Sequence, residues 1–355
     1  MLKVIIVGAG LAGLSAAISL RRGGHIVHIY EKSSTNLEIG AAINVPPNAT
    51  KFLTRWGLVP SSCHFTKSRR VTYHDPFTMD TTAVHSTDST ARDIGDSELY
   101  YAHRSDLHSA LKRLATRPDG PGVPVMISLN SHVKGYNPSK PSITLANSDE
   151  IHADLVIGAD GIHSLASRVV TGRANPPIPS NHSNHCFRFL ISADTLEQDP
   201  ETRFWNQDCD GWTRLFSHDE TRRRLVTYPC REFSDFDPRL LKIISKATDV
   251  RCWPLLYRHP ISTWTREYLT LVGDAAHPML PHQGQGAAQG MEDGVALGIV
   301  LYGATKNDIQ ERLKTYTDIR YTRACVIQIL SSVGQDQSHL VHDELLNYIK
   351  KEEMP

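Results

Sequence analysis

A stretch late in the chain, GDAAHPMLPHQGQG from Gly273 to Gly286, carries the first side chains that could do chemistry. Asp274, His277 and His282 lie within it, and zinc and iron accept carboxylate and imidazole ligands in proteins. Its glycines also suit a loop whose backbone approaches a ligand closely. A metal site and a cofactor site are therefore both open for this stretch.

A second set of glycines stands at the start of the chain, where Gly8, Gly10 and Gly13 have the spacing G-x-G-x-x-G. These positions suit a tight turn, close approach to a pyrophosphate, and packing of a helix on a strand. Glu31 stands 18 positions after Gly13, close to where an acidic side chain meets a ribose hydroxyl in dinucleotide sites. The set predicts an adenine dinucleotide, with a tight turn of some other α/β fold as the alternative.

The residues around these glycines have the order strand, turn, helix, strand. Val4–Val7 is a β-branched run that suits a buried parallel strand, and Leu11–Leu20 has apolar residues at helical spacing. Gly23 and Gly24 end the helix, and Ile26–Tyr30 is the second strand. This pattern predicts a Rossmann-like βαβ unit.

Two later motifs repeat the step from an apolar strand into a turn. HADLVIGADGIHS places Asp160 at the carboxyl end of one strand, and YLTLVGDAAHP ends another at Asp274. Open α/β sheets bind ligands at that edge. After the first βαβ unit, HRSDLHSAL predicts a helix with Ser105 as its N-cap and Arg104 just before the cap.

The character of the sequence changes between about residues 175 and 266, where short strand-like pieces stand between polar turns. We expect an α/β fold: a Rossmann-like nucleotide-binding domain with an inserted mixed or antiparallel β-sheet domain and C-terminal helices. The expected divisions are residues 1–174, with a small-sheet excursion at about 60–100, then 175–266 as the inserted sheet, and 267–355 as the return of the first domain.

The composition limits which classes of partner the protein could bind. Lys+Arg and Asp+Glu both total 38 in 355 residues, so no basic field favours nucleic acid or an anionic membrane. The longest later apolar run, Val295–Ala304, is far short of the roughly 20 residues that span a bilayer. The 6 cysteines are scattered without C-x-x-C, which predicts a reducing compartment, the cytoplasm. A small-molecule enzyme fits this balance.

Taken in order, GAGLAG with Glu31, GADGIHS, and GDAAHPMLPHQGQGAAQGMEDG resemble the single-component FAD-dependent aromatic monooxygenases of the salicylate hydroxylase and 4-hydroxybenzoate hydroxylase type. The pattern is most similar to fungal members that serve secondary metabolism. Further matches are EIGAAINVPPNATKFLTRWGL, HRSDLHSAL, CFRFLIS and WPLLYRHPISTW. The resemblance covers nearly the whole chain.

The resemblance implies that the loop from Gly273 faces a non-covalently bound FAD and holds no metal. Asp274 would hydrogen-bond the ribityl chain, and the helix that begins at Gly286 would direct its N-terminus at the pyrimidine end of the flavin, where reduced flavin carries negative charge. The other FAD contacts that the resemblance implies are Glu31 at the adenosine ribose, Arg104 on the FAD backbone, Ala42 and Ala287 along the cofactor, and Asp160 in the second fingerprint.

The resemblance also implies a reaction. NADPH or NADH would reduce the FAD, O₂ would add at flavin C4a, and the resulting hydroperoxide would transfer oxygen to an aromatic, phenolic or polycyclic small molecule. No second complete G-x-G-x-x-G is present for the nicotinamide cofactor, which is typical of this family. We expect a monomer or a homodimer.

Two residues of the inserted sheet are the catalytic candidates. Arg188 in CFRFLIS is a charge within an apolar strand, which is costly unless it meets a polar pocket or a partner. Tyr228 in LVTYPC could exchange a proton with a substrate oxygen. Some fungal phenol-dearomatising relatives carry an active-site Arg and Tyr at these places. The alternatives are a solvent-facing arginine and a core tyrosine.

One departure from the family pattern keeps other activities open. The piece between Tyr228 and WPLLYRHP is some tens of residues shorter than in relatives, so the substrate sheet is expected to be trimmed. The alternatives are an FAD-dependent epoxidase or dehydrogenase acting on an indole or alkene, and a non-catalytic flavoprotein that serves as a binding module.

Overall fold

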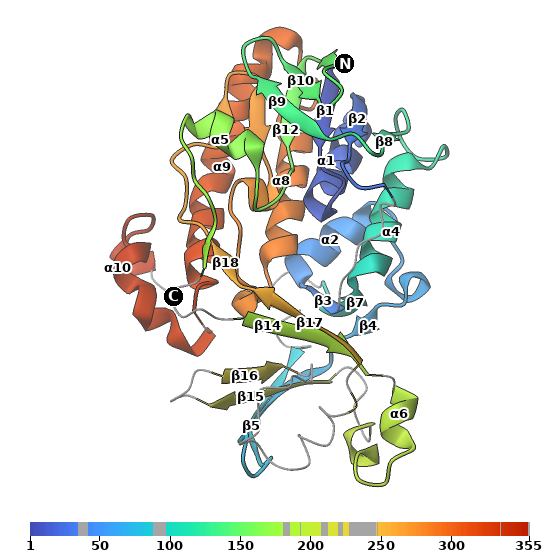
Figure 1. Ribbon diagram of the computed structural model, residues 1–355, viewed down its shortest axis with the longest axis vertical. Helices are drawn as coiled ribbons and strands as arrows, with labels where there is room; N and C mark the ends of the chain where they lie inside the picture. The colour runs from blue at the N-terminus through green and yellow to red at the C-terminus, as the bar shows by residue number, and fades with distance from the viewer. Residues whose placement is uncertain are drawn as a thin grey trace.

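The computed structural model describes the chain except for residues 35–41, 88–96, 180–184, 192, 207–211, 219–222, 227–245, 247, 334 and 354–355. A large α/β body carries the N-terminus, and smaller sheets extend from it at the opposite end (Figure 1). The predicted fold class is confirmed, since a mostly parallel six-stranded sheet, smaller mixed and antiparallel sheets and C-terminal helices are all present.

The core of the body is a six-stranded sheet with the order β19-β20-β12-β1-β2-β8. All neighbours pair in parallel except β19, which is antiparallel to β20. The last four residues of β1 and the whole of β12 are buried and carry no charged side chain, because both faces of the sheet are covered. Their bounds are β1 Lys3–Val7, β2 Ile26–Tyr30, β8 Met126–Ser128, β12 Leu155–Gly158, β19 Thr265–Arg266 and β20 Leu269–Leu271.

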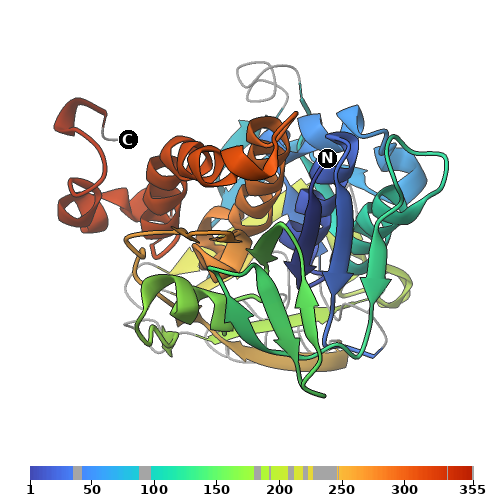
Figure 2. The same ribbon diagram turned by 90° about the horizontal axis from the view of Figure 1, so that it is seen from above.

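Helices cover one face of this sheet and a small sheet covers the other. The helices are α1 Leu11–Arg22, α4 Arg104–Thr116, α8 Gly286–Val300 and α9 Ile309–Leu330, and the small sheet has the order β11-β10-β9. Its strands are β9 Val133–Asn137, β10 Ser142–Leu145 and β11 Glu150–His152. Figure 2 shows α8 and α9 on the opposite side of the main sheet from these three strands.

The smaller sheets join strands from two distant parts of the chain. A four-stranded sheet has the order β16-β15-β5-β6, and its β5–β15 pair is parallel, so the sheet is mixed. Its strands are β5 Arg70–His74, β6 Thr81–Ser86, β15 Trp212–His218 and β16 Arg223–Val226. Part of the excursion expected at about 60–100 therefore shares a sheet with the inserted region, while the predicted domain bounds stay a prediction.

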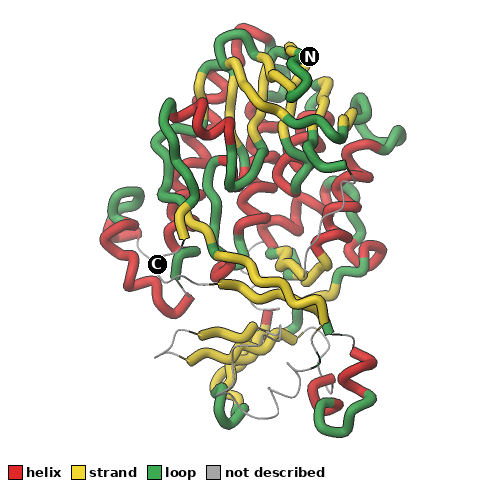
Figure 3. The backbone as a smooth tube through the Cα atoms, in the orientation of Figure 1, coloured by secondary structure: helices red, strands yellow, loops and turns green. Residues whose placement is uncertain are grey.

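Short strand pairs lie between the body and this mixed sheet. The strands β14 His185–Leu190 and β17 Thr248–Pro254 are antiparallel, and Figure 3 shows the pair crossing between the helices and the mixed sheet. Two further groups are β13 Ile178–Pro179 with β18 Leu256–Tyr257, and β7 Tyr100–His103 between β3 Ala42–Val45 and β4 Thr66–Lys67.

The remaining elements are short, and one expected helix start was wrong. They are α2 Pro47–Arg55, η1 Pro60–Cys63, α5 Leu165–Thr171, α6 Ala193–Glu197, η2 Arg203–Asn206, η3 Gly273–Ala275, η4 Pro281–Gln283, η5 Lys306–Asp308, η6 Gln335–Val341, α10 His342–Leu345 and η7 Lys351–Glu353. The helix α4 begins at Arg104, so Ser105 lies inside it and His103 is the N-cap. Within the ranges given above, no helix combines the length and apolar character needed to cross a membrane.

Candidate active site

The predicted motifs meet at one edge of the main sheet. In the parallel register Val7 pairs with Tyr30 and Gly158, and Gly158 pairs with Leu271, so these strands end side by side. The motif positions that follow these strand ends are Gly8, Glu31, Asp160 and Asp274. This is the carboxyl edge, where open α/β sheets bind their ligands.

The glycine turn after β1 has the geometry of a pyrophosphate site. Gly8 has φ +108°, and a Cβ there would lie 2.3 Å from the Ala159 carbonyl oxygen. A Cβ at Gly13 would lie 2.1 Å from the Gly8 oxygen, whereas one at Gly10 would meet nothing within 4 Å. Gly10 is also the N-cap of α1 and offers no side-chain cap. The open position therefore lies where free helix N–H groups can bind an anion.

Glu31 is held beside this turn by two backbone donors. The N–H of Ala9 donates to Oε2 at 2.8 Å, and the N–H of Ser33 donates to Oε1 at 2.8 Å. A carboxylate oxygen can accept a further hydrogen bond. Glu31 is thus oriented by the glycine turn and keeps acceptor capacity for a ribose hydroxyl.

Asp160 has one satisfied and one unsatisfied carboxylate oxygen. Its Oδ2 accepts from the Tyr136 hydroxyl at 2.9 Å and from the N–H groups of Leu165 and Ala166 at 2.9 and 3.1 Å. Burial and the Asp160 charge raise the pKa of the Tyr136 phenol well above its ordinary value. The Oδ1 atom is buried and has no partner among the described residues. A donor from a cofactor would satisfy it.

Asp274 lies deep at the same edge, yet its side chain is open to solvent. Desolvation by the surrounding protein raises its pKa, while the charges of His277, Arg104 and Arg258 act in the opposite direction. The structure thus brings Arg104 close to Asp274 across 170 positions of sequence. A solvent-open carboxylate surrounded by protein is a suitable acceptor for the hydroxyls of a ribityl chain.

The strand β3 and the start of α8 complete this edge. Ala42 pairs in register with His103, the residue before Arg104. A Cβ at Gly284, which has φ +62°, would lie 2.8 Å from Nδ2 of Asn44, so the loop before α8 contacts β3.

The helix α8 begins at Gly286, and Ala287 is half-buried in its first turn. Its N-cap residue, Gln285, makes no side-chain cap hydrogen bond. The first N–H groups of a helix have no acceptor within the helix and carry about half a positive charge. All the predicted FAD contacts therefore surround the same sheet edge, and the donors and acceptors found there fit a dinucleotide.

His277 is part of a buried ionic network, which sequence reasoning missed. Its Nε2 donates to Oδ2 of Asp293 at 2.6 Å, and the N–H of Gly273 donates to the same oxygen at 2.9 Å. Nε of Arg320 donates to Oδ1 at 2.8 Å. Burial would raise the pKa of Asp293, but the charges of His277 and Arg320 lower it to about 2. This network fixes the turn that carries Asp274.

The network extends from α8 to α2 and α9 through Glu292. Arg320 donates to Oε2 of Glu292 at 2.6 Å, Arg323 donates to both of its oxygens at 2.9 Å, and Asn48 donates to Oε1 at 2.6 Å. The signal in the sequence was the pair of acids inside an otherwise apolar helix, GMEDGVAL. Over the described ranges, no group of His, Cys, Asp and Glu could hold a metal ion.

Arg258 is a second missed residue. It is 2% exposed, and its guanidinium donates to the Ser167 hydroxyl at 3.2 Å and to the carbonyl oxygens of Asp274 and Ala275. The argument applied to Arg188, a charge beside apolar residues, also fits Arg258 after WPLLY.

Tyr101 joins the cofactor edge to the mixed sheet. It lies in β7, and its hydroxyl is hydrogen-bonded to Oγ of Ser68 at 2.9 Å and to the hydroxyl of Thr213 in β15. The tyrosine is half-buried. No sequence signal singled it out, because Tyr101, Ser68 and Thr213 come from three separate segments.

The two catalytic candidates stay predictions. Arg188 lies in β14 opposite Arg251 of β17, and the structure describes the backbone there but not the Arg188 side chain. Tyr228 lies outside the described residues.

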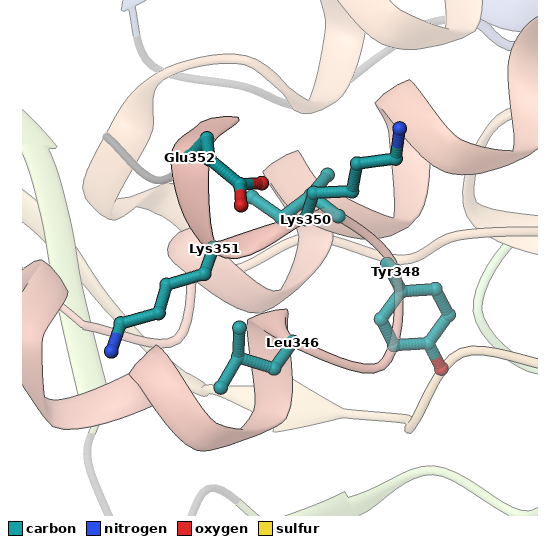
Figure 4. A pocket seen from close by; sticks show the side chains of 6 residues that line it. Leu346, Tyr348, Lys350, Lys351 and Glu352 are labelled. Carbon is teal, nitrogen blue, oxygen red and sulfur yellow. The ribbon is translucent and has the colours of Figure 1, made fainter.

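A hollow at the C-terminal end lies apart from these motifs. It is lined by Leu346, Tyr348, Ile349, Lys350, Lys351 and Glu352. Figure 4 shows its two lysines extending in different directions. None of its residues belongs to the cofactor edge.

Comparison with known proteins places the chain in a family. The family described as "FAD binding domain" matches residues 1–174 and 204–328 of this chain. The FAD-dependent monooxygenase cfoG of Aspergillus candidus is 47% identical over 390 aligned positions, which cover 100% of this chain and 90% of that protein. Hispidin-3-hydroxylase of Neonothopanus nambi is 32% identical, with coverage of 91% of this chain and 86% of that protein.

The fold comparison agrees. The crystal structure of FqzB is 25% identical and has a TM-score of 0.76, with coverage of 99% of this chain and 89% of that chain. The alignment with cfoG spans 390 positions and this chain has 355 residues, so at least 35 positions of that relative face a gap here. The chain therefore belongs to the FAD-dependent monooxygenases, and FAD is its cofactor.

Proposed function

We propose that this monooxygenase hydroxylates an aromatic small molecule, phenolic or polycyclic, with O₂ and with NADPH or NADH as the electron donor. The name of a relative supports this substrate class. The 3-amino-4-hydroxybenzoate 2-monooxygenase PtnB3 of Streptomyces platensis is 28% identical over 95% of this chain. Non-covalently bound FAD would accept a hydride from NAD(P)H and deliver oxygen from O₂ to the substrate.

The chain's own residues would hold and orient the cofactor. The turn with Gly8, Gly10 and Gly13 would bind the pyrophosphate, and Glu31 would bind the adenosine ribose. Asp274 would accept hydrogen bonds from the ribityl chain. The first turn of α8, with Gly286 and Ala287, would stabilise negative charge on the reduced flavin. The remaining contacts are assigned to Ala42, Arg104 and Asp160.

The substrate would lie between this edge and the inserted region, residues 175–266, together with β5 and β6. Arg188 is proposed to fix an ionised substrate oxygen, and Tyr228 to exchange a proton with it. The hydroxyl of Tyr101 is a further donor or acceptor at this boundary. Protein on both sides would exclude water, which protects the oxygen transfer from loss as H₂O₂.

The contact between Tyr101 and Thr213 carries the proposal. Tyr101 belongs to β7, which pairs with the strand that contains Ala42, while Thr213 belongs to the mixed sheet. A direct hydroxyl contact between these two parts supports a substrate pocket where cofactor and sheet meet.

A substrate screen with isotope-labelled oxygen tests the proposal. The FAD-loaded protein would be mixed with NADPH or NADH and a panel of phenols, polycyclic aromatics, indoles and alkenes under ¹⁸O₂. We expect at least one phenol or polycyclic aromatic to stimulate NAD(P)H oxidation and to gain one ¹⁸O on a ring carbon.

Three other outcomes would overturn it. Oxygen inserted across an alkene or indole double bond would mean an epoxidase, and a product that loses two hydrogens without gaining oxygen would mean a dehydrogenase. FAD-loaded protein that oxidises neither nicotinamide with any compound of the panel would contradict NAD(P)H-dependent hydroxylation.

A further inference from the structure

The guanidinium of Arg258 connects two cofactor motifs that are far apart in the sequence. Nη1 donates to the hydroxyl of Ser167, which lies in the helix α5 that follows Asp160. Nη2 donates to the main-chain oxygens of Asp274 and Ala275, the latter at 3.3 Å. One side chain therefore contacts both the Asp160 helix and the Asp274 turn.

Burying the Arg258 guanidinium costs free energy of desolvation, which its hydrogen bonds to Ser167, Asp274 and Ala275 offset. Arg258 is 2% exposed, and burying a guanidinium without partners is strongly unfavourable. Desolvation lowers its pKa, while the charges of Asp274 and Asp160 act in the opposite direction. Its planar fork can reach a hydroxyl and two carbonyl oxygens at once, which a lysine ammonium cannot do in the same geometry.

The backbone of Arg258 is fixed as well. Its carbonyl oxygen accepts from Nε2 of Gln328 in α9 at 2.7 Å. It directly follows β18 and stands four positions after the end of β17, the strand that pairs with β14. The contact to the Asp274 turn therefore starts from the segment that connects the substrate strands to the body.

We propose that Arg258 is a positioning residue that locks the Asp274 turn to the Asp160 helix, so that the two motifs hold FAD as one unit. The inference rests on FAD as the cofactor and on the place of Asp274 in its site. It does not depend on the substrate or on the choice of NADPH or NADH. Its failure is therefore distinguishable from failure of the aromatic hydroxylation.

A double-mutant cycle on FAD binding tests this role. The FAD dissociation constant of deflavinated protein would be measured for wild type, Arg258→Met, Asp274→Asn and the double variant. We expect each single variant to weaken FAD binding on the order of tenfold, the scale of a lost charge-assisted hydrogen bond. If Arg258 acts through the Asp274 turn, the double variant should bind FAD about as weakly as the weaker single variant.

Arg266→Met is the matched control. Arg266 is exposed and donates to the carbonyl oxygen of Val169 in α5 at 3.0 Å, but no contact joins it to the Asp274 turn in the described part of the chain. Its FAD dissociation constant should stay within about twofold of wild type, as expected for an exposed contact of this kind. Arg258→Lys should rescue only part of the loss.

Ser167→Ala removes the other end of the contact and serves if Arg258→Met does not fold. It should weaken FAD binding severalfold, and it should add nothing to Arg258→Lys if both act on one contact. If the fold-increases in the FAD dissociation constant multiply in the double variant of either cycle, the proposal is overturned. The two residues would then contribute independently to FAD binding or to folding. FAD affinity unchanged in Arg258→Met would overturn it too.

Discussion

At the residue scale, Asp274 in the loop after β20 and Asp293 in α8 have pKa values shifted in opposite directions. Desolvation raises the pKa of Asp274, which has no cation directly bonded to its carboxylate among the described contacts. Asp293 is more deeply buried, but its direct bonds to His277 and Arg320 lower its pKa to about 2. Asp274 is therefore suited to accept hydrogen bonds from a ligand. Asp293, which is bonded within the protein, is suited to hold the loop in place.

The residue-scale prediction concerns Arg188 in β14, which we propose as the cation that fixes an ionised substrate oxygen. Arg188→Ala should leave FAD content and folding unchanged while product formation falls about 10²-fold, the scale of a lost charge-stabilising contact. NAD(P)H oxidation should continue and yield H₂O₂, since oxygen activation belongs to the flavin in the proposed reaction.

The measurement is the ratio of hydroxylated product to NAD(P)H consumed, with the phenol that stimulates most strongly. Arg203→Ala, which alters an exposed arginine in η2, is the control and should keep the wild-type ratio. A wild-type ratio in Arg188→Ala would remove this arginine from the pocket.

At the element scale, the cofactor edge depends on the close packing of α1 against α8. A Cβ at Gly294 would lie 2.5 Å from the backbone nitrogen of Ala16, and one at Gly290 would lie 2.9 Å from Cβ of Ala12. These helices begin at the two glycine-rich turns, after Gly10 and at Gly286. Their spacing therefore sets the distance between the pyrophosphate turn and the flavin end of the site.

Two glycine substitutions separate packing from cofactor binding. Gly294→Ala should lower the free energy of unfolding of the FAD-free protein by about 1–3 kcal/mol, since backbone atoms of α1 cannot rotate away. Gly10→Ala should change it by less than about 0.5 kcal/mol, because its Cβ meets nothing within 4 Å, but it should weaken FAD binding. Urea denaturation and FAD titration of both variants check this, and the reverse pattern would contradict it.

At the scale of the whole molecule, a buried histidine joins the residue before the first strand to the C-cap residue of α8. Nδ1 of His25 accepts from the N–H of Leu2 at 3.2 Å, so Nε2 carries the proton and donates to the Leu301 carbonyl oxygen at 2.9 Å. The fold thus uses the neutral ring. Burial lowers the pKa of His25 below its ordinary value of 6.5.

The buried His25 should make the fold less stable at acidic pH. Because the folded-state pKa is the lower one, the contribution of His25 to stability is complete above pH 6.5 and is lost as the pH falls below that value. As the pH falls below 6.5, the free energy of unfolding of wild type should fall relative to that of His25→Gln. The glutamine keeps a donor and an acceptor but does not titrate. The relative slope should reach at most about 1.4 kcal/mol per pH unit.

Urea denaturation of both proteins between pH 5 and 8 measures this difference. His28 and His74, whose pKa values burial also lowers, remain in both proteins and so cancel. Parallel curves for His25→Gln would mean that the buried ring does not titrate in this range.

The sequence by itself determined the local parts of this protein. The bounds of β2 and the start of α8 agree with the sequence predictions, because glycine and apolar periodicity act within a few residues. The place of Gly8, Gly10 and Gly13 in the turn after β1 follows from the same short-range steric needs. With Glu31, they predicted a nucleotide site, and the family resemblance predicted FAD, which the comparisons confirm.

Only the tertiary structure decided which distant polar groups meet. Arg258 reaches Ser167 across 91 positions, and Arg320 reaches Asp293 across 27. The local sequence around His277 is equally compatible with a metal ligand, a loop residue and a buried partner of Asp293, which is what the structure shows. Such pairings depend on how α5, α8 and α9 pack around the sheet, because a buried charge is tolerated only where the assembled fold supplies its partner.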